Sequence, residues 1–541
     1  MSDTAAAPEH RVFWADEVAD EIEARDPEDP IIIKGGVSPS GIPHIGHLNE
    51  IIRGYFVAEV LRERGHEVRQ VFTSDDKDPL RKIPRKLADL DFNIKELGEL
   101  ENPGALGRNL GKPLTSVPDP FGCCDSFGAH QTKLLAKNAE AFGIPIEVIS
   151  NTELYAEGKF DDVVAYLLEN QEKAADVLSK YQDKVDADYI PFNPICENCG
   201  KLTETVLSYD IEAGTVEYEC TDLKAGGNVI EGCGHKGTAT FRDGKLPWRF
   251  EWPAQWQVLK VDHEPFGKDH AAGSWPSGKD IAENVLGNEA PVPMVYEWFT
   301  YNGEALSSSA GNVVTAHEVL ELLEPEVFKY FFSLSPKKAR DFDVSRLNQL
   351  VDDFDRFEAI YFDRTDDEDL KPLADRVYPF LVDEVNEDRV RLPYTFAAVL
   401  GMTDDVDLRE EMARNEEHFT DDTPAWAVED ALKRVEKARN WAERMDNEYN
   451  YRLQVELPET DFDEATQAAL EDLAEFVEAG HDGEAIQGEI YETAKRHDVG
   501  VGDFFTAGYR LFFDAEQGPR LGTFLGELDR EFVVTRLRRQ G

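Results

Sequence analysis

Residues 31–50, IIIKGGVSPSGIPHIGHLNE, constrain the possible folds of this chain more than any other segment. The run of isoleucines predicts a buried strand, the glycines and prolines predict a loop, and the residues after that loop predict a new helix. A second strand is predicted at QVFTSDD (70–76). A strand, a helix and a second strand in this order indicate a parallel, doubly wound α/β sheet, in which ligands bind beyond the carboxyl ends of the strands.

The loop between the first strand and its helix has a composition that suits a phosphate ligand. It reads Pro39-Ser40-Gly41-Ile42-Pro43-His44-Ile45-Gly46-His47. Glycine lets the backbone approach a ligand closely, and a helix N-terminus presents unpaired N–H groups to an anion. The imidazoles of His44 and His47 can donate hydrogen bonds to phosphate oxygens as negative charge develops on them. A turn with incidental histidines is the structural alternative.

The net charge of the chain is extreme. Asp+Glu number 109 against 57 Lys+Arg, which gives a formal charge of −52 spread along the length. We interpret this as the solvated acidic surface of a halophilic protein, because concentrated salt screens such a surface and keeps it soluble. A polyanion repels RNA, but at ~1 M salt the screening length falls to roughly 3 Å, so local basic clusters can still govern RNA binding.

Length and sequence texture suggest how the chain divides. It has 541 residues, and single hydrophobic cores stop growing near ~250–300 residues, so several compact units are expected. We predict an α/β unit in two parts, 1–186 and 246–335, separated by a cysteine-bearing, glycine-rich insertion at 187–245 and followed by a helical region at 336–541. The N-terminus carries no basic region or apolar run, and no apolar stretch could span a bilayer, so a cytoplasmic protein is expected.

The cysteines fall into two groups. Cys196-Glu-Asn-Cys199, Cys220 and Cys233-Gly-His235 have the spacing of a structural zinc site, with Cys233 as the expected fourth ligand and His235 as the alternative. Buried thiols without a metal are the structural alternative. Cys123 and Cys124 are adjacent, which is too close for an ordinary disulfide, and we interpret them as packing or lining residues without a metal.

These motifs, in this order, resemble the class I lysyl-tRNA synthetases of archaea. His44-Ile45-Gly46-His47 is similar to the HIGH signature of class I synthetases, and the similarity runs over about residues 10–541, through RVFWADE, GKPLTSVPDPFG, GKDH and GPRLGTFLGELDREFVVTRL. The resemblance implies a Rossmann-type catalytic domain, a zinc-bearing insertion and a C-terminal all-α anticodon-binding region. It also implies that lysine is activated with ATP and Mg²⁺ to lysyl-adenylate and is then transferred to tRNA(Lys). We expect a monomer.

The same resemblance implies roles for individual residues. Asp269 is expected to accept the ribose hydroxyls of ATP, and Glu50, one turn beyond His47, is expected to bind the ammonium group of lysine. A solvated helix face is the structural alternative for Glu50, and core packing is the alternative for the aromatic residues. The expected ATP-binding residues are Pro39, Ser40, Gly41, His44, Gly46, His47, Gly267, Asp269 and His270, and the expected lysine-binding residues are Ser40, Glu50, Trp248, His270 and Tyr296.

The segment Ala305-Leu306-Ser307-Ser308-Ser309-Ala310-Gly311-Asn312 resembles the KMSKS signature of the family but lacks both of its lysines. In the family these lysines neutralise the leaving pyrophosphate. We expect Ser307, Ser308 and Ser309 to take a catalytic part through hydroxyl and N–H groups, with Mg²⁺ supplying positive charge. A flexible serine-rich turn is the structural alternative.

Two basic clusters are candidate contacts for tRNA phosphates, with ion pairs to neighbouring acids as the alternative interpretation. They are Lys77, Arg81, Lys82, Arg85 and Lys86 in the first part of the chain, and Lys433, Arg434, Lys437 and Arg439 in the helical region. Asp75 and Asp76 follow the second predicted strand, and they are candidate site residues or helix caps.

Two other functions are kept as alternatives. A class I synthetase for glutamate would need an arginine where Glu50 stands, so the acidic residue favours lysine. A paralogue that binds tRNA or adenylate without charging it is suggested only by the missing lysines, and the HIGH and GKDH motifs argue against it.

Overall fold

The structure is a computed structural model that describes residues 12–182, 185, 188–225, 228–306 and 314–540. The chain forms two compact units, and both are assembled from segments that are discontinuous in sequence. Unit 1 comprises Met1–Val319, Phe328–Phe342 and Glu368–Asp383, and unit 2 comprises Leu320–Val327, Asp343–Asp367 and Glu384–Gly541. The four-part division made from the sequence stays a prediction.

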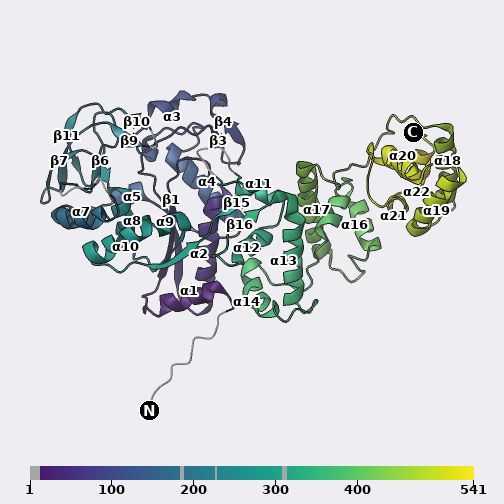
Figure 1. Cartoon of the computed structure of the whole chain (residues 1–541), viewed down its shortest axis with the longest axis horizontal. Coiled ribbons are helices and arrows are strands. Elements are labelled where there is room, and N and C mark those ends of the chain that lie inside the picture. The colour runs from purple at the N-terminus through teal and green to yellow at the C-terminus, as the bar shows by residue number, and fades with distance from the viewer. Residues whose placement is uncertain (1–11, 183–184, 186–187, 226–227, 307–313, 541) are drawn as a thin grey trace, which may run out of the picture. The chain divides into compact units, whose positions relative to one another are not determined.

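Unit 1 is built around a five-stranded parallel sheet (Figure 1). Its strands lie in the order β14-β13-β1-β2-β5. Their bounds are β1 Ile31–Val37, β2 Val68–Ser74, β5 Glu147–Ser150, β13 His263–Gly267 and β14 Val292–Tyr296. The chain adds β2 and β5 on one side of β1 and β13 and β14 on the other, so the strand order reverses between β1 and β13. Ligands bind at such a reversal, beyond the carboxyl ends of the strands.

Helices cover both faces of this sheet. They are α1 Trp14–Glu23, α2 Ile45–Glu63, α4 Phe127–Ala141, α8 Trp248–Leu259, α9 Lys268–Ala271 and α10 Ser274–Ile281. Helix α2 packs on β1, β2 and β13. Trp252 and Trp256 of α8 belong to a hydrophobic core that also includes Ile32 of β1 and Val71 of β2. Their large indole rings are buried in this core. Trp252 and Trp256 therefore fix α8 against one face of the sheet.

The insertion is formed by short antiparallel strands. A three-stranded sheet has the order β11-β8-β7, with β7 Val206–Asp210, β8 Thr215–Glu219 and β11 Lys236–Thr240. Two strand pairs flank it, β6 Asn193–Pro194 with β12 Gly244–Lys245 and β9 Leu223–Ala225 with β10 Asn228–Ile230. Its core is continuous with α5 Asn151–Ala156, α6 Asp161–Glu169 and α7 Gln171–Ser179.

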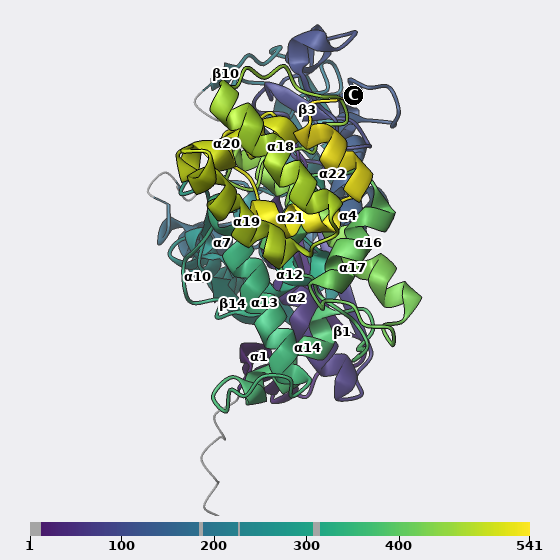
Figure 2. The same cartoon turned by 90° about the vertical axis from the view of Figure 1, so that its right-hand side faces the viewer.

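The second half of the chain is almost entirely helical. Figures 1 and 2 both show the last five helices packed as one bundle. The helices after the sheet are α11 Ala316–Leu320, α12 Pro325–Ser333, α13 Leu347–Tyr361, α14 Lys371–Leu381, α15 Tyr394–Leu400, α16 Val406–Asn415, α17 Ala425–Met445, α18 Glu464–Glu478, α19 Gly483–Arg496, α20 Val501–Phe513, α21 Leu521–Glu527 and α22 Arg530–Leu537. The expected fold class, an α/β sheet domain with a cysteine-bearing insertion and a helical C-terminal region, is confirmed.

No helix within the described ranges combines the length and the apolar character that crossing a bilayer requires.

Candidate active site

The two histidines of the HIGH motif lie at the N-terminus of α2. His44 is the N-cap: its Nδ1 accepts a hydrogen bond from the Gly46 N–H at 3.0 Å, while His47 Nδ1 accepts from the His44 N–H at 3.1 Å. The two rings stack with centroids 4.1 Å apart. Because both Nδ1 atoms accept, each neutral ring carries its proton on Nε2. Each imidazole therefore presents an Nε2–H donor at the positive end of a helix.

Both imidazoles are neutral at physiological pH. Burial lowers the pKa of His47 to about 4. Burial first, and then the electrostatic interaction between the two adjacent rings, lowers the pKa of His44 well below its ordinary value. The two rings can thus act as neutral hydrogen-bond donors to an anion, but they do not supply a full positive charge.

Glu50 lies on α2, one turn beyond His47, against the carboxyl end of β1. Its Oε1 accepts the Gly36 N–H at 2.8 Å, and its Oε2 accepts the Tyr296 hydroxyl at 3.3 Å. A side chain at Gly35 would place its Cβ 2.5 Å from Glu50 Oε1, so only glycine allows the strand to approach this carboxylate. The structure thus brings Glu50 and Tyr296 together, as expected from the sequence.

The pKa of Glu50 is raised to about 8, first by burial and then by the negative charge of Glu264. Desolvation disfavours the ionised form of a carboxyl group, and an arriving cation restores that form. The site therefore favours a ligand that carries a positive charge to Glu50. This is the electrostatic property that an ammonium group requires of its binding pocket.

A buried ion pair supports this part of the site. Lys34 Nζ lies 2.8 Å from Glu264 Oε1, and the two side chains are 1% and 3% exposed. The same oxygen accepts the Trp252 indole N–H at 2.8 Å, and Glu264 Oε2 accepts the indole N–H of Trp256. Sequence reasoning missed this pair. The only signal was a lysine inside the apolar run IIIKGG.

The expected aromatic and GKDH residues gather at the ends of β13 and β14. Trp248 stacks on Trp252 with ring centroids 5.3 Å apart and lies 6.3 Å from the His270 ring. His270 Nε2 is 3.5 Å from Asp269 Oδ2, and the Asp269 side chain is largely exposed. Gly267 precedes them at the end of β13. Asp269 and His270 therefore lie at the carboxyl end of β13 with exposed side chains, and their part in ATP binding stays a prediction.

The remaining loop residues lie between β1 and α2. Ser40 is exposed and its N–H donates to the Ser38 carbonyl at 2.8 Å, while Pro39 is buried and Gly41 is half-buried. Among the described contacts, none joins the Ser40 side chain to Glu50 or Trp248. Ser40 as a lysine-binding residue stays a prediction.

Ser307, Ser308 and Ser309 lie outside the described residues, but the residues on either side of them lie beside the HIGH motif. Leu306 Cδ1 would be 3.8 Å from a Cβ placed on Gly46. The Val314 carbonyl accepts the Ile45 N–H at 2.9 Å. The two described residues that flank the serine segment, Leu306 and Val314, therefore lie at the N-terminus of α2. The resemblance to KMSKS implies this location.

The four cysteines of the insertion form a closed cluster. The Sγ atoms of Cys196, Cys199, Cys220 and Cys233 all lie within 4.8 Å of one another. Cys196 is 3.6 Å from Cys233, and Cys199 is 3.6 Å from Cys220. Tetrahedral zinc with sulfur at about 2.3 Å requires sulfur atoms about 3.8 Å apart, so this cluster fits the ion. His235 instead bonds Glu197 at 2.9 Å, which leaves Cys233 as the fourth candidate ligand.

A second cluster has metal-like geometry, although the sequence was interpreted without a metal there. The ligand atoms of Asp119, Cys123, Cys124 and His130 also lie within 4.8 Å of one another. His130 Nε2 lies 2.9 Å from the Ala88 carbonyl, and His130 Nδ1 lies 3.3 Å from both Cys123 Sγ and Asp119 Oδ1. A ligating histidine characteristically donates its other N–H to such a carbonyl. The sequence pattern that could have indicated a metal site here is Asp-x₃-Cys-Cys-x₅-His, which begins at Asp119.

The two acids after β2 are structural. Asp76 accepts the Thr152 N–H at 2.8 Å and so caps α5, whereas Asp75 accepts the side-chain amides of Asn151 at 2.8 Å and Gln255 at 2.9 Å. Both side chains are buried. Of the two interpretations made from the sequence, the structure favours the cap for Asp76. It favours a buried hydrogen-bonded position for Asp75.

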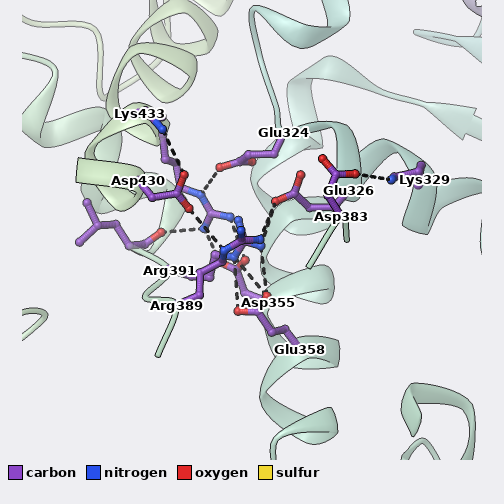
Figure 3. A network of polar contacts seen from close by, with 12 residues as sticks. Glu324, Glu326, Lys329, Asp355, Glu358, Asp383, Arg389, Arg391, Asp430 and Lys433 are labelled. Carbon is purple, nitrogen blue, oxygen red and sulfur yellow. Dashed lines mark hydrogen bonds and ion pairs between the residues drawn. The ribbon is translucent and has the colours of Figure 1, made fainter. Parts of the chain in front are cut away.

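The basic cluster on α17 is engaged in ion pairs. Arg434 is 2% exposed and pairs with Glu324 at 2.7 Å and Asp355 at 2.5 Å, so it cannot reach an RNA phosphate. Lys437 donates to the Leu320 carbonyl at 2.5 Å, and Lys433 lies 3.4 Å from Asp430. Figure 3 shows the carboxylates of Glu324, Asp355 and Asp430 in this network. For α17 the ion-pair interpretation therefore holds.

Comparison with known proteins identifies the family of the chain. The family model described as tRNA synthetases class I (K) matches residues 12–381. The lysine–tRNA ligase of Haloarcula marismortui is 65% identical over 98% of this chain and 97% of its own length. That of Halobacterium salinarum is 64% identical over 98% and 97%, and that of Pyrococcus horikoshii is 32% identical over 98% and 100%. These matches span the HIGH loop, the Glu50 site and the insertion, and the chain therefore belongs to the class I lysyl-tRNA synthetases.

Proposed function

We propose that this chain, as a class I lysine–tRNA ligase, binds the side chain of lysine at Glu50 and the phosphates of ATP at His44 and His47. The observation that carries the proposal is the desolvated Glu50 carboxylate, held by the Gly36 N–H at 2.8 Å and the Tyr296 hydroxyl at 3.3 Å. A carboxylate in this environment gains most from a cationic ligand. Trp248, His270 and Tyr296 would enclose the methylene stem of lysine.

The proposed reaction has two steps. A carboxylate oxygen of lysine attacks the α-phosphorus of ATP, and pyrophosphate leaves with the electron pair of the broken bond. The terminal ribose hydroxyl of tRNA(Lys) then attacks the carbonyl carbon, AMP leaves, and the hydroxyl proton passes to the leaving phosphate. The Nε2–H groups of His44 and His47 stabilise the charge that develops on the phosphate oxygens. Asp269 would hold the ribose of ATP.

Two groups would compensate for the missing lysines of KMSKS: the Mg²⁺ that accompanies ATP and the hydroxyls of the serine segment. Neutral His44 and His47 supply donors without full charge, so the Mg²⁺ that accompanies ATP supplies the positive charge. Ser307, Ser308 and Ser309 would add hydroxyl donors to the pyrophosphate. No enzyme nucleophile is needed, because positioning and electrostatics lower the barrier of both steps. The enzyme would act in the cytoplasm, where its tRNA is used.

Aminoacylation tests the proposal directly. Purified protein in concentrated KCl with Mg²⁺, ATP and tRNA(Lys) is incubated with radiolabelled lysine or glutamate, and charged tRNA is counted. We expect charging with lysine and none with glutamate, because the side chain of glutamate brings no cation to Glu50 and would bury a second carboxyl group beside it. Charging with glutamate would support a different specificity, and binding of tRNA without charging of either amino acid would support the non-catalytic paralogue.

We further propose that the Cys196 cluster and the Asp119 cluster each hold one structural Zn²⁺. Both sets are closed, with four protein ligands, and leave no open position for a substrate. Purified wild-type protein is expected to contain about two zinc ions per chain, measured by inductively coupled plasma mass spectrometry. Cys196→Ser and Cys123→Ser should each lose about one ion, because each removes one thiolate ligand.

His235→Ala is the matched control for the zinc measurement. His235 bonds Glu197 at 2.9 Å and is not a ligand, so the control should retain both ions. A Cys123→Ser protein that keeps the full zinc content would disprove the Asp119 site without affecting the Cys196 site. Loss of both ions from either serine variant would indicate unfolding beyond the substituted site and would overturn the independence of the two sites.

A further inference from the structure

The two candidate clusters of cations differ in their partners. On α17, Lys433 and Arg434 are paired with acids and Lys437 donates to the Leu320 carbonyl. The side chains of Arg81, Lys82, Arg85 and Lys224 are exposed, and in the described ranges they form no hydrogen bond or ion pair. Carboxylates are abundant in a chain of net charge −52, yet within the described ranges none forms an ion pair with these four side chains. Such a group is suited to bind an anion from outside the chain.

Two of these cations line a pocket of 210 Å³ in unit 1. Its lining comes from three parts of the unit: the loop after β2, the insertion, and the segment that leads into α8. The lining includes Asp78, Arg81, Glu204, Lys224, Lys245 and Trp248. The lining of the pocket therefore combines exposed cations, carboxylates and one indole.

One residue that lines the pocket, Lys245, is a buried cation held between two carboxylates. Lys245 is 3% exposed and contacts both Asp78 and Glu251, the latter at 2.6 Å. Burial raises the pKa of Asp78, but the charges of Lys245 and Arg81 outweigh burial and keep that pKa below its ordinary value. Asp78 is thus an ionised acceptor for hydroxyl or amino groups of a ligand, and Arg81 lies close enough to influence it.

The pocket adjoins the candidate active site through Trp248. This indole lines the pocket and also lies 6.3 Å from the His270 ring. A ligand held in the pocket would therefore be adjacent to the residues expected to bind lysyl-adenylate. Transfer of lysine to tRNA requires a terminal ribose hydroxyl at that location.

We propose that this pocket receives the 3′-terminal nucleotide of tRNA(Lys), with Arg81 and Lys224 contacting phosphate and Trp248 lying against the base. The inference rests on the proposed aminoacylation and adds the place where the acceptor end enters. Aromatic rings stack on any base, and exposed arginine and lysine neutralise backbone phosphates. The carboxylates Asp78 and Glu204 accept hydrogen bonds from ribose hydroxyls or a base amino group. Lys82 and Arg85, on the loop after Arg81, extend the phosphate-binding surface.

The test compares two tRNA(Lys) transcripts, one intact and one without its terminal adenosine. Dissociation constants are measured by filter binding in the KCl concentration that supports charging. The wild-type enzyme is expected to bind the intact transcript about tenfold more tightly, which corresponds to about 1.4 kcal/mol. In the Arg81→Ala/Lys224→Ala double variant this ratio should fall toward one, because the pocket no longer holds the terminal phosphate. Its KM for tRNA should rise about tenfold, with KM for ATP and lysine unchanged.

Lys433→Ala is the matched control, since it removes one exposed cation from unit 2 and should leave the ratio at its wild-type value. The conservative Arg81→Lys/Lys224→Arg variant should restore most of the ratio, which shows that folding is intact. The proposal is overturned if the double alanine variant keeps the tenfold ratio, or if wild type does not distinguish the transcripts. A rise in KM for ATP alone would assign the pocket to ATP. Failure of wild type to charge any tRNA would refute the proposed function instead.

Discussion

Glu50→Gln is expected to raise the KM for lysine about 100-fold and to leave the KM for ATP nearly unchanged. A hydrogen bond between charged groups contributes about 1.5–3 kcal/mol, and 2.7 kcal/mol corresponds to about 100-fold. Glutamine keeps the size of the side chain and can still accept from the Gly36 N–H, which Glu50 Oε1 accepts at 2.8 Å in the native protein. The substitution therefore removes the charge with little change in shape. Steady-state kinetics with varied lysine and varied ATP measure both constants.

The pH dependence of the same constant follows from the raised pKa of Glu50. Burial and the charge of Glu264 raise that pKa to about 8 in the empty site, so below pH 8 most molecules carry a protonated Glu50. Lysine must displace this proton, and its KM should fall up to about tenfold per pH unit between pH 6 and 8 and then level off. In the Glu50→Gln variant the KM for lysine should not change with pH. A KM for lysine that is also independent of pH in the wild type would show that Glu50 does not bind lysine.

Asp269→Asn provides the reciprocal control for Glu50→Gln. The Asp269 carboxylate is expected to hold the ribose of ATP, and its side chain is largely exposed at the end of β13. We expect this variant to raise the KM for ATP more than the KM for lysine. Equal effects of the two substitutions on both substrates would indicate a general disturbance of the site.

Arg434→Ala is expected to destabilise unit 2 by about 3–5 kcal/mol, because it leaves two largely buried carboxylates, 13% and 20% exposed, without the cation that pairs with both. The guanidinium donates to Glu324 at 2.7 Å, to both oxygens of Asp355 at 2.5 Å and 2.9 Å, and to the Leu392 carbonyl at 2.8 Å. Figure 3 shows these carboxylates beside Arg391, which pairs with Glu358 at 3.1 Å. Urea unfolding at constant high KCl, followed by far-ultraviolet circular dichroism, gives the loss of free energy.

Lys433→Ala removes the same charge from the preceding position of the same helix. Its side chain is 65% exposed and lies 3.4 Å from Asp430, so its pair should contribute less than about 1 kcal/mol. A midpoint shift for Arg434→Ala no larger than that for Lys433→Ala would contradict the structural role of Arg434. The two variants together separate a buried network from a surface ion pair on one helix.

Several features of the molecule could be predicted from neighbouring residues alone. The strand, loop and helix of residues 31–50, the imidazole pair His44 and His47, and the Cys196–Cys199 half of the insertion site depend on contacts within a few residues. Hydrophobic periodicity and glycine content encode such local structure directly. The placement of Glu50 beneath the HIGH loop also follows, since residues one turn apart share a helix face.

Other features depend on residues that are far apart in the chain. The Lys34–Glu264 pair joins positions 230 residues apart, and the ion pair between Arg434 and Glu324 joins positions 110 residues apart. The sequence offered Arg434 and Arg81 as equivalent phosphate contacts, whereas the fold buries one among acids and leaves the other exposed beside a pocket. The sequence of this protein determined its local elements, its motifs and its family. Only the tertiary structure decided which charges are buried, paired or available, because burial and electrostatic environment arise from distant segments that folding brings together.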